Sequence, residues 1–391
     1  MSLRTLQDIG DIAGKRVLLR GNLNVPVAQS QVVDPFRIEM LIPTITFLHD
    51  RGAKVILCGH LGRDATATLE PVARYLQDHV PTVLVRDIMS PNAAETISYV
   101  APGTVVLLEN LRRYEGEEKN DSTFAATLAS FADIFVQDDF SVCHRSHASV
   151  VGVPKLLPSY AGLQLEQEVT QLTKAFTPDH PFLFILGGAK VETKLPLLQQ
   201  FKDTADTLFV GGVLANDFFK GMGKEVGIST LSNEHAPKEL LDDKKIVLPH
   251  DVVVERSGKR VTVPYDAVLP KDAIYDAGRS TIADLLGHIK RAKFILWNGP
   301  LGYCEAGYCD ATQTVAAAIA ASPAYSVVGG GDTLAAVSDE IQLEMDFVST
   351  GGGAMLDFLA NKTLPGITAI VESIAPSPLA AHQTPVDHQT A

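Results

Sequence analysis

Apolar runs in the second half of this chain repeatedly end in glycine. Residues 182–186 lead into a glycine pair at 187–188, and residues 325–328 lead into a glycine triplet at 329–331. Apolar runs of this length are typical of buried parallel strands. A glycine turn after such a strand leaves bare backbone N–H groups at the carboxyl edge of the sheet, where open α/β folds bind ligands, and such groups suit phosphate. The pattern therefore predicts a parallel α/β fold that binds an anion.

Apolar runs alternate with segments of helical period along the whole chain. The runs lie at residues 16–19, 54–57, 82–85, 105–108, 134–136, 182–186, 207–210, 294–297, 325–328 and 346–349. This alternation predicts stacked βαβ units and parallel sheets. Because 391 residues exceed the size at which one core normally splits, we expect two Rossmann-like, three-layer α/β domains in tandem.

An amphipathic helix is predicted between these domains. Its apolar positions are Leu165, Val169, Leu172 and Phe176, and its polar positions include Glu166, Gln167, Glu168 and Gln171. Such a period predicts that the apolar set is buried and the polar set faces solvent. We therefore expect an N-terminal domain at 1–161, a hinge helix at 162–177 and a C-terminal domain at 178–356. Residues 375–391 show no periodicity, which predicts a disordered tail.

Composition limits the classes of partner. A formal net charge of −13 argues against nucleic acid or an anionic membrane, because both select broad basic surfaces, but a small anionic substrate needs only a local basic cluster. No apolar signal segment and no run of eighteen apolar residues occur, so we expect neither a signal peptide nor a membrane span. Cys58, Cys143, Cys304 and Cys309 show no paired spacing, which favours a reducing compartment, the cytoplasm, with Cys304 and Cys309 as small buried apolar residues.

Positive side chains follow the predicted strands of the first half or stand at a helix start. They are Arg20, Arg37, His60, Arg63, Arg112 and Arg145. The carboxyl ends of parallel strands meet at one edge of a sheet, and the paired N–H donors of arginine bind phosphate and carboxylate. The first half therefore predicts an anion site at that edge.

The glycine turns of the second half have charged neighbours. Lys190 and Lys194 follow the pair at 187–188 and stand four residues apart, which predicts that both approach phosphates from one face of the next helix. Asp332 follows the triplet at 329–331, where a carboxylate suits Mg²⁺ on nucleotide phosphates. A glycine triplet alone is equally consistent with tight packing of a strand on a helix. The P-loop and dinucleotide glycine motifs are absent, which disfavours a P-loop kinase and a dehydrogenase.

Segments in series over residues 6–366 resemble the phosphoglycerate kinase family. They are Leu-Asn-Val-Pro at 23–26, His-Leu-Gly-Arg at 60–63, Leu-Glu-Asn-Leu-Arg at 108–112, Gly-Gly-Ala-Lys at 187–190, Trp-Asn-Gly-Pro at 297–300, Gly-Gly-Gly-Asp-Thr at 329–333 and Ser-Thr-Gly-Gly-Gly-Ala at 349–354. The resemblance implies reversible phosphoryl transfer between 1,3-bisphosphoglycerate and ADP, giving 3-phosphoglycerate and MgATP. It also implies a monomer with a deep cleft between domains that close by hinge bending, and a segment at 357–374 that returns to the N-terminal domain.

The resemblance also implies residues for each substrate. The phosphoglycerate site would comprise Asn22, Asn24, Arg37, His60, Leu61, Gly62, Arg63, Arg112 and Arg145. The nucleotide site would comprise Gly187, Gly188, Lys190, Lys194, Gly211, Gly212, Asn298, Pro300, Glu305, Gly330, Gly331, Asp332 and Thr333, with Glu305 at the ribose and Asp332 at Mg²⁺. The transfer itself would involve Arg37, Lys190, Gly351, Gly352 and Gly353.

The chain departs from the family pattern at several positions. Asn22 stands where the family usually has aspartate, which removes a carboxylate from the expected phosphoglycerate site. Val213 stands at a usual glycine position and would narrow the adenine pocket, and Ser141-Val142 and Asn361 are further departures. A catalytically weakened paralogue that only binds phosphoglycerate or nucleotide is therefore a second hypothesis.

Overall fold

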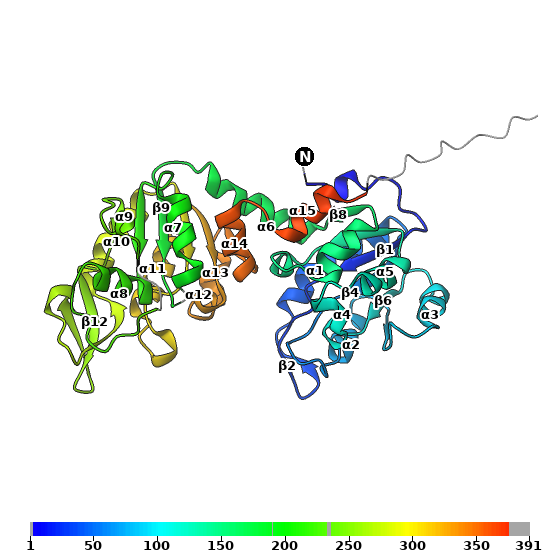
Figure 1. The fold of residues 1–391 in the computed structure, drawn as a ribbon, viewed down its shortest axis with the longest axis horizontal. Helices are drawn as coiled ribbons and strands as arrows, with labels where there is room; N and C mark the ends of the chain where they lie inside the picture. The colour runs from blue at the N-terminus through cyan, green and yellow to red at the C-terminus, as the bar shows by residue number, and fades with distance from the viewer. Residues whose placement is uncertain (1–2, 190, 233–235, 375–391) are drawn as a thin grey trace, which may run out of the picture. The chain divides into compact units, whose positions relative to one another are not determined.

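The computed structural model describes residues 3–189, 191–232 and 236–374 of the chain (Figure 1). Its contacts divide the chain into two compact units. The first comprises Met1–Asp138, Ser146–Leu163 and Gly366–Ala391, and the second comprises Asp139–Arg145 and Gln164–Pro365. The tail predicted at 375–391 lies outside the described residues.

The main sheet of the first unit is parallel, in the order β5-β6-β4-β1-β7-β8. Its strands are β1 (Arg16–Arg20), β4 (Lys54–Cys58), β5 (Thr82–Val85), β6 (Val105–Leu108), β7 (Ile134–Gln137) and β8 (Ser159–Ala161). The strands predicted for this half are all present, whereas the short β8 contains no apolar run that would predict it. A small hairpin of β2 (Val27–Ala28) and β3 (Gln31–Val32) follows β1.

Helices cover both faces of this sheet (Figure 1). The helices of the first unit are α1 (Phe36–Asp50), α2 (Glu70–Gln77), α3 (Ala93–Tyr99), α4 (Glu115–Glu118), α5 (Ser122–Ser130) and α15 (Pro365–Glu372). Val17 and Leu19 of β1 share a buried cluster with α1, whereas Leu18 joins a separate cluster with Phe124 and Leu128 of α5. This alternation along β1 gives the predicted three layers.

The main sheet of the second unit is also parallel, in the order β11-β10-β9-β15-β16-β17. Its strands are β9 (Phe182–Leu186), β10 (Thr207–Val210), β11 (Ile246–Val247), β15 (Phe294–Asn298), β16 (Tyr325–Gly329) and β17 (Phe347–Ser349). The predicted strands form, and the last begins one residue later than expected. The two parallel α/β folds are therefore confirmed.

An antiparallel sheet in the second unit was not expected. It consists of β12 (Asp251–Arg256), β13 (Lys259–Pro264) and β14 (Ala273–Ala277), with β12 in the centre. Only alternate residues of β12, Val252 and Val254, are buried; its run of three valines stands between the charged residues Asp251 and Glu255, and we predicted no strand there.

The helices of the second unit begin directly after several strand ends. They are α7 (Leu195–Phe201), α8 (Gly212–Gly221), α9 (Lys238–Leu241), α10 (Arg279–Arg291), α11 (Asp310–Ala320), α12 (Gly331–Ala335), α13 (Asp339–Leu343) and α14 (Gly353–Asn361). Leu183 and Ile185 of β9 pack with α10 and α11, while the Phe182 and Phe184 rings contact Phe201 of α7 at centroid distances of 6.0 and 5.3 Å. The bounds of these elements also show that glycine turns connect β10, β16 and β17 to the helices that follow them, at the carboxyl edge of the sheet.

The helix predicted between the two halves forms as α6 (Leu163–Thr173), followed by a 3-10 turn (Lys174–Phe176). Leu165 and Leu172 are buried as expected, but Glu168 is fully buried too, and Val169 is only half-buried. The prediction that Glu168 faces solvent is wrong, because its carboxylate accepts hydrogen bonds from Ser349 and Thr350 in the interior. Within the described ranges, no helix is both long and apolar enough to cross a bilayer.

Candidate functional site

Asn24 connects several of the predicted phosphoglycerate residues. Arg37, near the start of α1, donates from Nη1 to the backbone carbonyl of Asn24 at 2.6 Å. Asn24 Oδ1 accepts the N–H of Gly62 at 2.8 Å, and the N–H of Asn24 donates to Oδ1 of the buried Asn22 at 3.4 Å. The loop after β1, the start of α1 and the loop after β4 are therefore held together at one residue.

A cavity of about 340 Å³ lies beside this junction. It is lined by Asn24, Val25, Pro26, Asp34 and Arg37. Arg37 is half-buried, and Gly62 and Arg63 are exposed. A guanidinium group at such a cavity is suited to a phosphate or carboxylate, because it offers paired N–H donors.

Arg20 and His60 form a buried pair. Arg20 is 1% exposed, and its guanidinium donates to Ser149 Oγ at 3.1 Å and to the Gly21 carbonyl at 2.8 Å. Its Nη2 lies 3.1 Å from Nδ1 of His60, and Ser149 donates its amide and hydroxyl to the buried Glu117 carboxylate. The expectation that Arg20 faces a ligand is therefore wrong: it is a buried support that orients the His60 ring.

Asn110 is a further buried residue, which the sequence motif contains but which we did not single out. Its Oδ1 accepts the N–H groups of Leu61 and Arg112, both at 3.1 Å, and its Nδ2 donates to the carbonyls of Leu61 and Ala67. Asn110 therefore fixes the loop after β4 to the loop after β6. Arg112 is also held by an ion pair with Glu118.

Arg145 groups with the second unit in its contacts, unlike the other predicted phosphoglycerate residues. Its Nε donates to Nε2 of His144 at 3.4 Å. Burial lowers the pKa of His144, and the adjacent Arg145 charge lowers it further. The imidazole is thus kept neutral and can accept this hydrogen bond.

The strand ends of the second unit hold a connected group of polar side chains. Lys194 is 5% exposed and donates from Nζ to Asn298 Oδ1 at 3.1 Å, while Asn298 Nδ2 donates to the Gly329 carbonyl at 2.8 Å. Thr333 Oγ1 accepts the N–H of Gly299 at 2.8 Å and donates to the Gly329 carbonyl at 3.2 Å. The structure therefore brings together three predicted nucleotide residues from β15, α12 and the segment before α7.

Lys194 does not lie within the helix that follows the glycine pair. Residues 191–193 form a 3-10 turn, and Lys194 immediately precedes α7. Pro196 stands in the first turn of α7, a position that favours a helix start there. The expectation that Lys194 lies on this helix is therefore wrong, and Lys190 lies outside the described residues.

Glycine allows the loops beside Lys194 to approach backbone to backbone. A Cβ at Gly299 would lie 2.1 Å from the Gly187 carbonyl oxygen, and one at Gly212 would lie 2.6 Å from the Gly188 nitrogen. The N–H groups of Gly187 and Gly188 donate to the carbonyls of Asn298 and Pro300 at 2.9 and 2.7 Å. The sequence pattern had suggested bare N–H groups here, but both amides are hydrogen-bonded. Glycine is needed at these positions for close packing of the backbones.

A pocket of about 340 Å³ opens beside these glycines. The predicted residues that line it are Gly188, Gly212, Pro300, Glu305 and Asp332. Residues that sequence reasoning did not assign also line it, among them Asn216, Phe219, Tyr275, Asp276, Leu301 and Tyr303. Part of this wall comes from β14, which no apolar run predicts. A pocket with aromatic walls and a few polar groups suits a flat ring with a polar edge.

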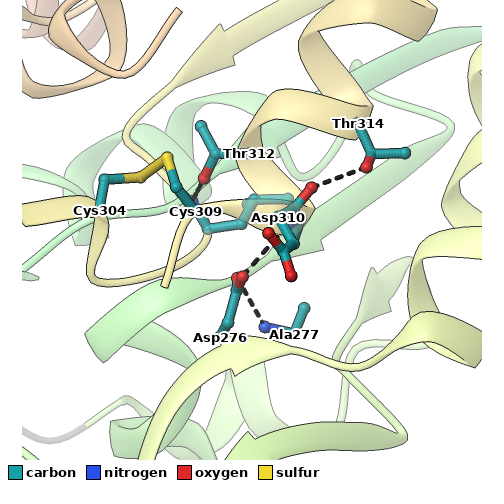
Figure 2. The surroundings of a disulfide bond; sticks show 9 residues. Asp276, Ala277, Cys304, Cys309, Asp310, Thr312 and Thr314 are labelled. Carbon is teal, nitrogen blue, oxygen red and sulfur yellow. Dashed lines mark hydrogen bonds between the residues drawn. A yellow bond between two sulfur atoms is a disulfide. The ribbon is translucent and has the colours of Figure 1, made fainter. Parts of the chain in front are cut away.

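Asp276 stabilises the wall of this pocket (Figure 2). Its carboxylate accepts the N–H groups of Ala277 at 2.9 Å and Ala311 at 3.2 Å. Burial raises the pKa of Asp276 to about 7. A Cβ at Gly302 would lie 2.4 Å from its Oδ1, so the absence of a side chain at Gly302 lets the carboxylate pack there. Asp276 thus links β14 to the start of α11.

Glu168 of α6 anchors the segment before the glycine turn at 351–353. Its carboxylate accepts the Ser349 hydroxyl at 2.8 Å, and the amide and hydroxyl of Thr350 at 2.8 and 3.0 Å. Burial raises the pKa of Glu168 to about 7. The Gly351 amide donates to Ser349 Oγ at 3.2 Å, whereas a Cβ at Gly352 or Gly353, at the start of α14, would meet no neighbouring atom within 4 Å.

Cys304 and Cys309 form a disulfide next to the pocket (Figure 2). Both residues are partly exposed, so the expectation of two small buried apolar residues is wrong. The loop between them folds back until their Cα atoms are 4.4 Å apart, which a spacing of five residues does not indicate. Cys58 and Cys143 are buried thiols.

Known proteins match this chain over nearly its whole length. The sequence profile described as phosphoglycerate kinase matches residues 6–362. Phosphoglycerate kinase from Methylorubrum extorquens (strain PA1) is 42% identical, covering 94% of this chain and 98% of that protein, and phosphoglycerate kinase from Thermomicrobium roseum is 39% identical, covering 95% and 100%. The structure of phosphoglycerate kinase from Coxiella burnetii matches with a TM-score of 0.82 at 35% identity, covering 95% of this chain and 98% of that one. The chain therefore belongs to the phosphoglycerate kinase family.

Proposed function

We propose that this protein, as a monomer in the cytoplasm, catalyses reversible phosphoryl transfer between 1,3-bisphosphoglycerate and ADP, giving 3-phosphoglycerate and ATP. Family membership supports the reaction class. The observation in this chain that carries the proposal is the buried group of Lys194, Asn298 and Thr333 beside a pocket lined by Asp332. A positioned ammonium group near an exposed carboxylate meets the needs of nucleotide phosphates with a divalent cation.

We assign the phosphoglycerate substrate to the surface around Arg37. The proposed ligands are Asn22, Asn24, Arg37, His60, Leu61, Gly62, Arg63, Arg112 and Arg145. The substrate carries a phosphate and a carboxyl group, and arginine side chains bind both through paired donors. Arg20 and Asn110 act behind them, because their buried hydrogen bonds hold His60 and the loop after β4 in place.

We assign ADP and ATP to the pocket of the second unit. The flat base suits the aromatic part of the wall, and the Glu305 carboxylate is suited to accept hydrogen bonds from ribose hydroxyl groups. The phosphates are assigned to the end near Gly188 and Lys194, which lie close to each other: a Cβ at Gly188 would be 3.5 Å from Lys194 Nζ. Val213 lines the same pocket, where it reduces the room for the base.

Asp332 is the proposed Mg²⁺ ligand. It is exposed, stands in the first turn of α12 and lines the pocket. Its carboxylate makes no hydrogen bond or ion pair with any described residue, so its oxygens are available. This fits a hard cation that takes one carboxylate and completes its shell with phosphate oxygens and water. When bound, the ion would neutralise charge on the nucleotide phosphates.

The transfer breaks the bond between phosphorus and the acyl oxygen of 1,3-bisphosphoglycerate and forms a bond to a β-phosphate oxygen of ADP, leaving a carboxylate. This step needs in-line geometry, exclusion of water and compensation of charge on the transferred oxygens. We propose Arg37 and Lys190 for the charge compensation, with the glycine turn at 351–353 near the transferred group. The two substrates must come together for this step, and we assign that motion to hinge bending at α6.

A coupled assay of ATP consumption that depends on 3-phosphoglycerate and Mg²⁺ tests the proposal. We expect the wild type to turn over, and Asn22→Asp to alter mainly the KM for 3-phosphoglycerate, because residue 22 lies in the proposed phosphoglycerate site. Removal of Mg²⁺ with a chelator should abolish turnover. Absence of wild-type turnover, with activity restored in Asn22→Asp, would contradict the proposal and support the weakened paralogue.

A further inference from the structure

The Cys304–Cys309 disulfide closes a small ring around a predicted nucleotide residue. Cys304 begins the 3-10 turn Cys304–Ala306, which contains Glu305, and Cys309 immediately precedes α11. Figure 2 shows the disulfide beside Asp310 and Thr312 at the start of α11, with Asp276 below. Both cysteines are partly exposed, so small thiols can reach this loop.

The ring is part of the pocket wall. Glu305, within the ring, lines the pocket, and so do Gly302 and Tyr303, which directly precede the ring. The N–H of Tyr303 donates to the Tyr275 carbonyl of β14 at 2.8 Å, and the Tyr275 ring contacts the rings of both Tyr303 and Tyr308, at centroid distances of 5.9 and 4.7 Å. Any change in the path of this loop therefore changes the shape of the pocket.

Glu305 depends on the backbone of the ring for its position. Its side chain is exposed, and with the described residues it makes no hydrogen bond or ion pair. The turn is held from within by the N–H of Gly307 donating to the Cys304 carbonyl at 2.9 Å and that of Tyr308 donating to the Tyr303 carbonyl at 3.0 Å. The disulfide adds a covalent link between the two ends of this turn.

We propose that the Cys304–Cys309 disulfide is a positioning element of the nucleotide site, and that its reduction by a dithiol reversibly weakens nucleotide binding by releasing the loop that carries Tyr303 and Glu305. The proposal rests on the proposed nucleotide role of this pocket. In the reaction, a thiolate of the dithiol attacks one sulfur and the second thiol resolves the mixed disulfide. The S–S bond breaks, Cys304 and Cys309 each gain an electron and a proton, and the dithiol becomes a disulfide.

The test compares the oxidised and the dithiothreitol-reduced wild type. Calorimetric titration with ADP and Mg²⁺ should show about three- to tenfold weaker binding after reduction, because a loop must then be ordered on binding. In the coupled assay the KM for the nucleotide should rise in parallel, while the KM for 3-phosphoglycerate and kcat at saturating nucleotide change little. Reoxidation should restore the original affinity.

Variants separate this loop from general effects of thiols. Cys304→Ser/Cys309→Ser should bind ADP like the reduced wild type and show no response to dithiothreitol, whereas Cys58→Ala should keep the response. Unchanged ADP affinity after complete reduction, verified by alkylation and mass spectrometry, would overturn the proposal, as would four alkylatable thiols in protein treated with an oxidant. Because ADP binding is measured directly, loss of turnover alone would instead count against the proposed reaction.

Discussion

At the scale of single residues, Arg20 and Arg37 show how differently two arginines of one sheet edge are used. Arg20 is enclosed by Ser149, Gly21 and His60, so its guanidinium has no room for a ligand. Arg37 has a hydrogen bond to the Asn24 carbonyl and lines the adjacent cavity, where it can offer further donors to an anion. The proposed role in charge compensation during transfer therefore falls to Arg37.

Arg37→Ala should lower kcat by at least about 10³-fold, because a transition-state arginine in phosphoryl transfer contributes about 10³ to 10⁵ in rate. Steady-state kinetics in the coupled assay measures the effect. Arg74→Ala is a matched control, since Arg74 lies in the last turn of α2 and is exposed. A loss of less than tenfold in Arg37→Ala would remove Arg37 from the mechanism.

The sequence could predict that these arginines stand near strand ends, but not which of them faces a ligand. That difference depends on partners far away in the chain, such as Ser149, which accepts a hydrogen bond from Arg20 and itself donates to Glu117. The same holds for Asn110, three of whose four side-chain hydrogen bonds reach the loop after β4, 43 to 49 residues earlier in the chain. Local pattern contains no information about such contacts until the topology is known.

At the scale of elements, α6 is tied to the segment before α14 through Glu168. Its carboxylate binds Ser349 and Thr350, and burial raises its pKa to about 7 from an ordinary value of 4.5. Because the folded state binds the proton more tightly than the unfolded chain, this group's contribution to stability falls as pH rises from about 4.5 to 7 and is constant above that.

Glu168→Gln should remove this pH dependence and keep most of the geometry, since an amide oxygen can accept from Thr350 and the amide N–H can donate to Ser349. Between pH 5.5 and 7.5 the free energy of unfolding of the wild type should fall by about 2 kcal/mol relative to the variant. Urea unfolding at a series of pH values measures the difference. Parallel curves for the two proteins would show that Glu168 does not titrate in this range.

Elements were predictable where burial on both faces produced a continuous apolar run, as in β1, β9 and β15. The sheet of β12, β13 and β14 was not predicted because its strands bury few apolar residues in a row: Val252 and Val254 alternate with less buried residues in β12, and Val263 is the one buried residue of β13. Its absence from the prediction had a consequence for the site, since Tyr275 and Asp276 of β14 line the pocket. Likewise, the proximity of Cys304 and Cys309 arises only when the loop after β15 folds back.

At the scale of the whole molecule, each unit has its own sheet and core, and the proposed nucleotide pocket lies entirely within the second unit. A ligand that binds the folded state alone stabilises it by an amount that depends on its concentration relative to its Kd. Nucleotide binding can therefore be measured as an increase in the stability of the folded protein, independently of enzyme activity.

ADP with Mg²⁺ at 100 times its Kd should stabilise the second unit by about 3 kcal/mol, which corresponds to a rise in Tm of about 5–10 °C for a unit of this size. Differential scanning calorimetry measures the shift. In Asp332→Asn the shift at the same ADP and Mg²⁺ concentrations should be smaller, because the proposed cation ligand loses its charge. An equal shift in both proteins would argue against Asp332 as that ligand.

The close approach of Gly187, Gly212 and Gly299 also bears on inhibitor design. Where these loops meet, the pocket presents main-chain atoms, because a Cβ at Gly212 or Gly299 would collide with the neighbouring backbone. A compound that binds only these main-chain atoms would recognise a shape that substitutions of side chains elsewhere barely alter, so it would not be selective. Selectivity for this protein is better sought at the side chains of the pocket, where Val213 offers an apolar contact and Tyr303 an aromatic one.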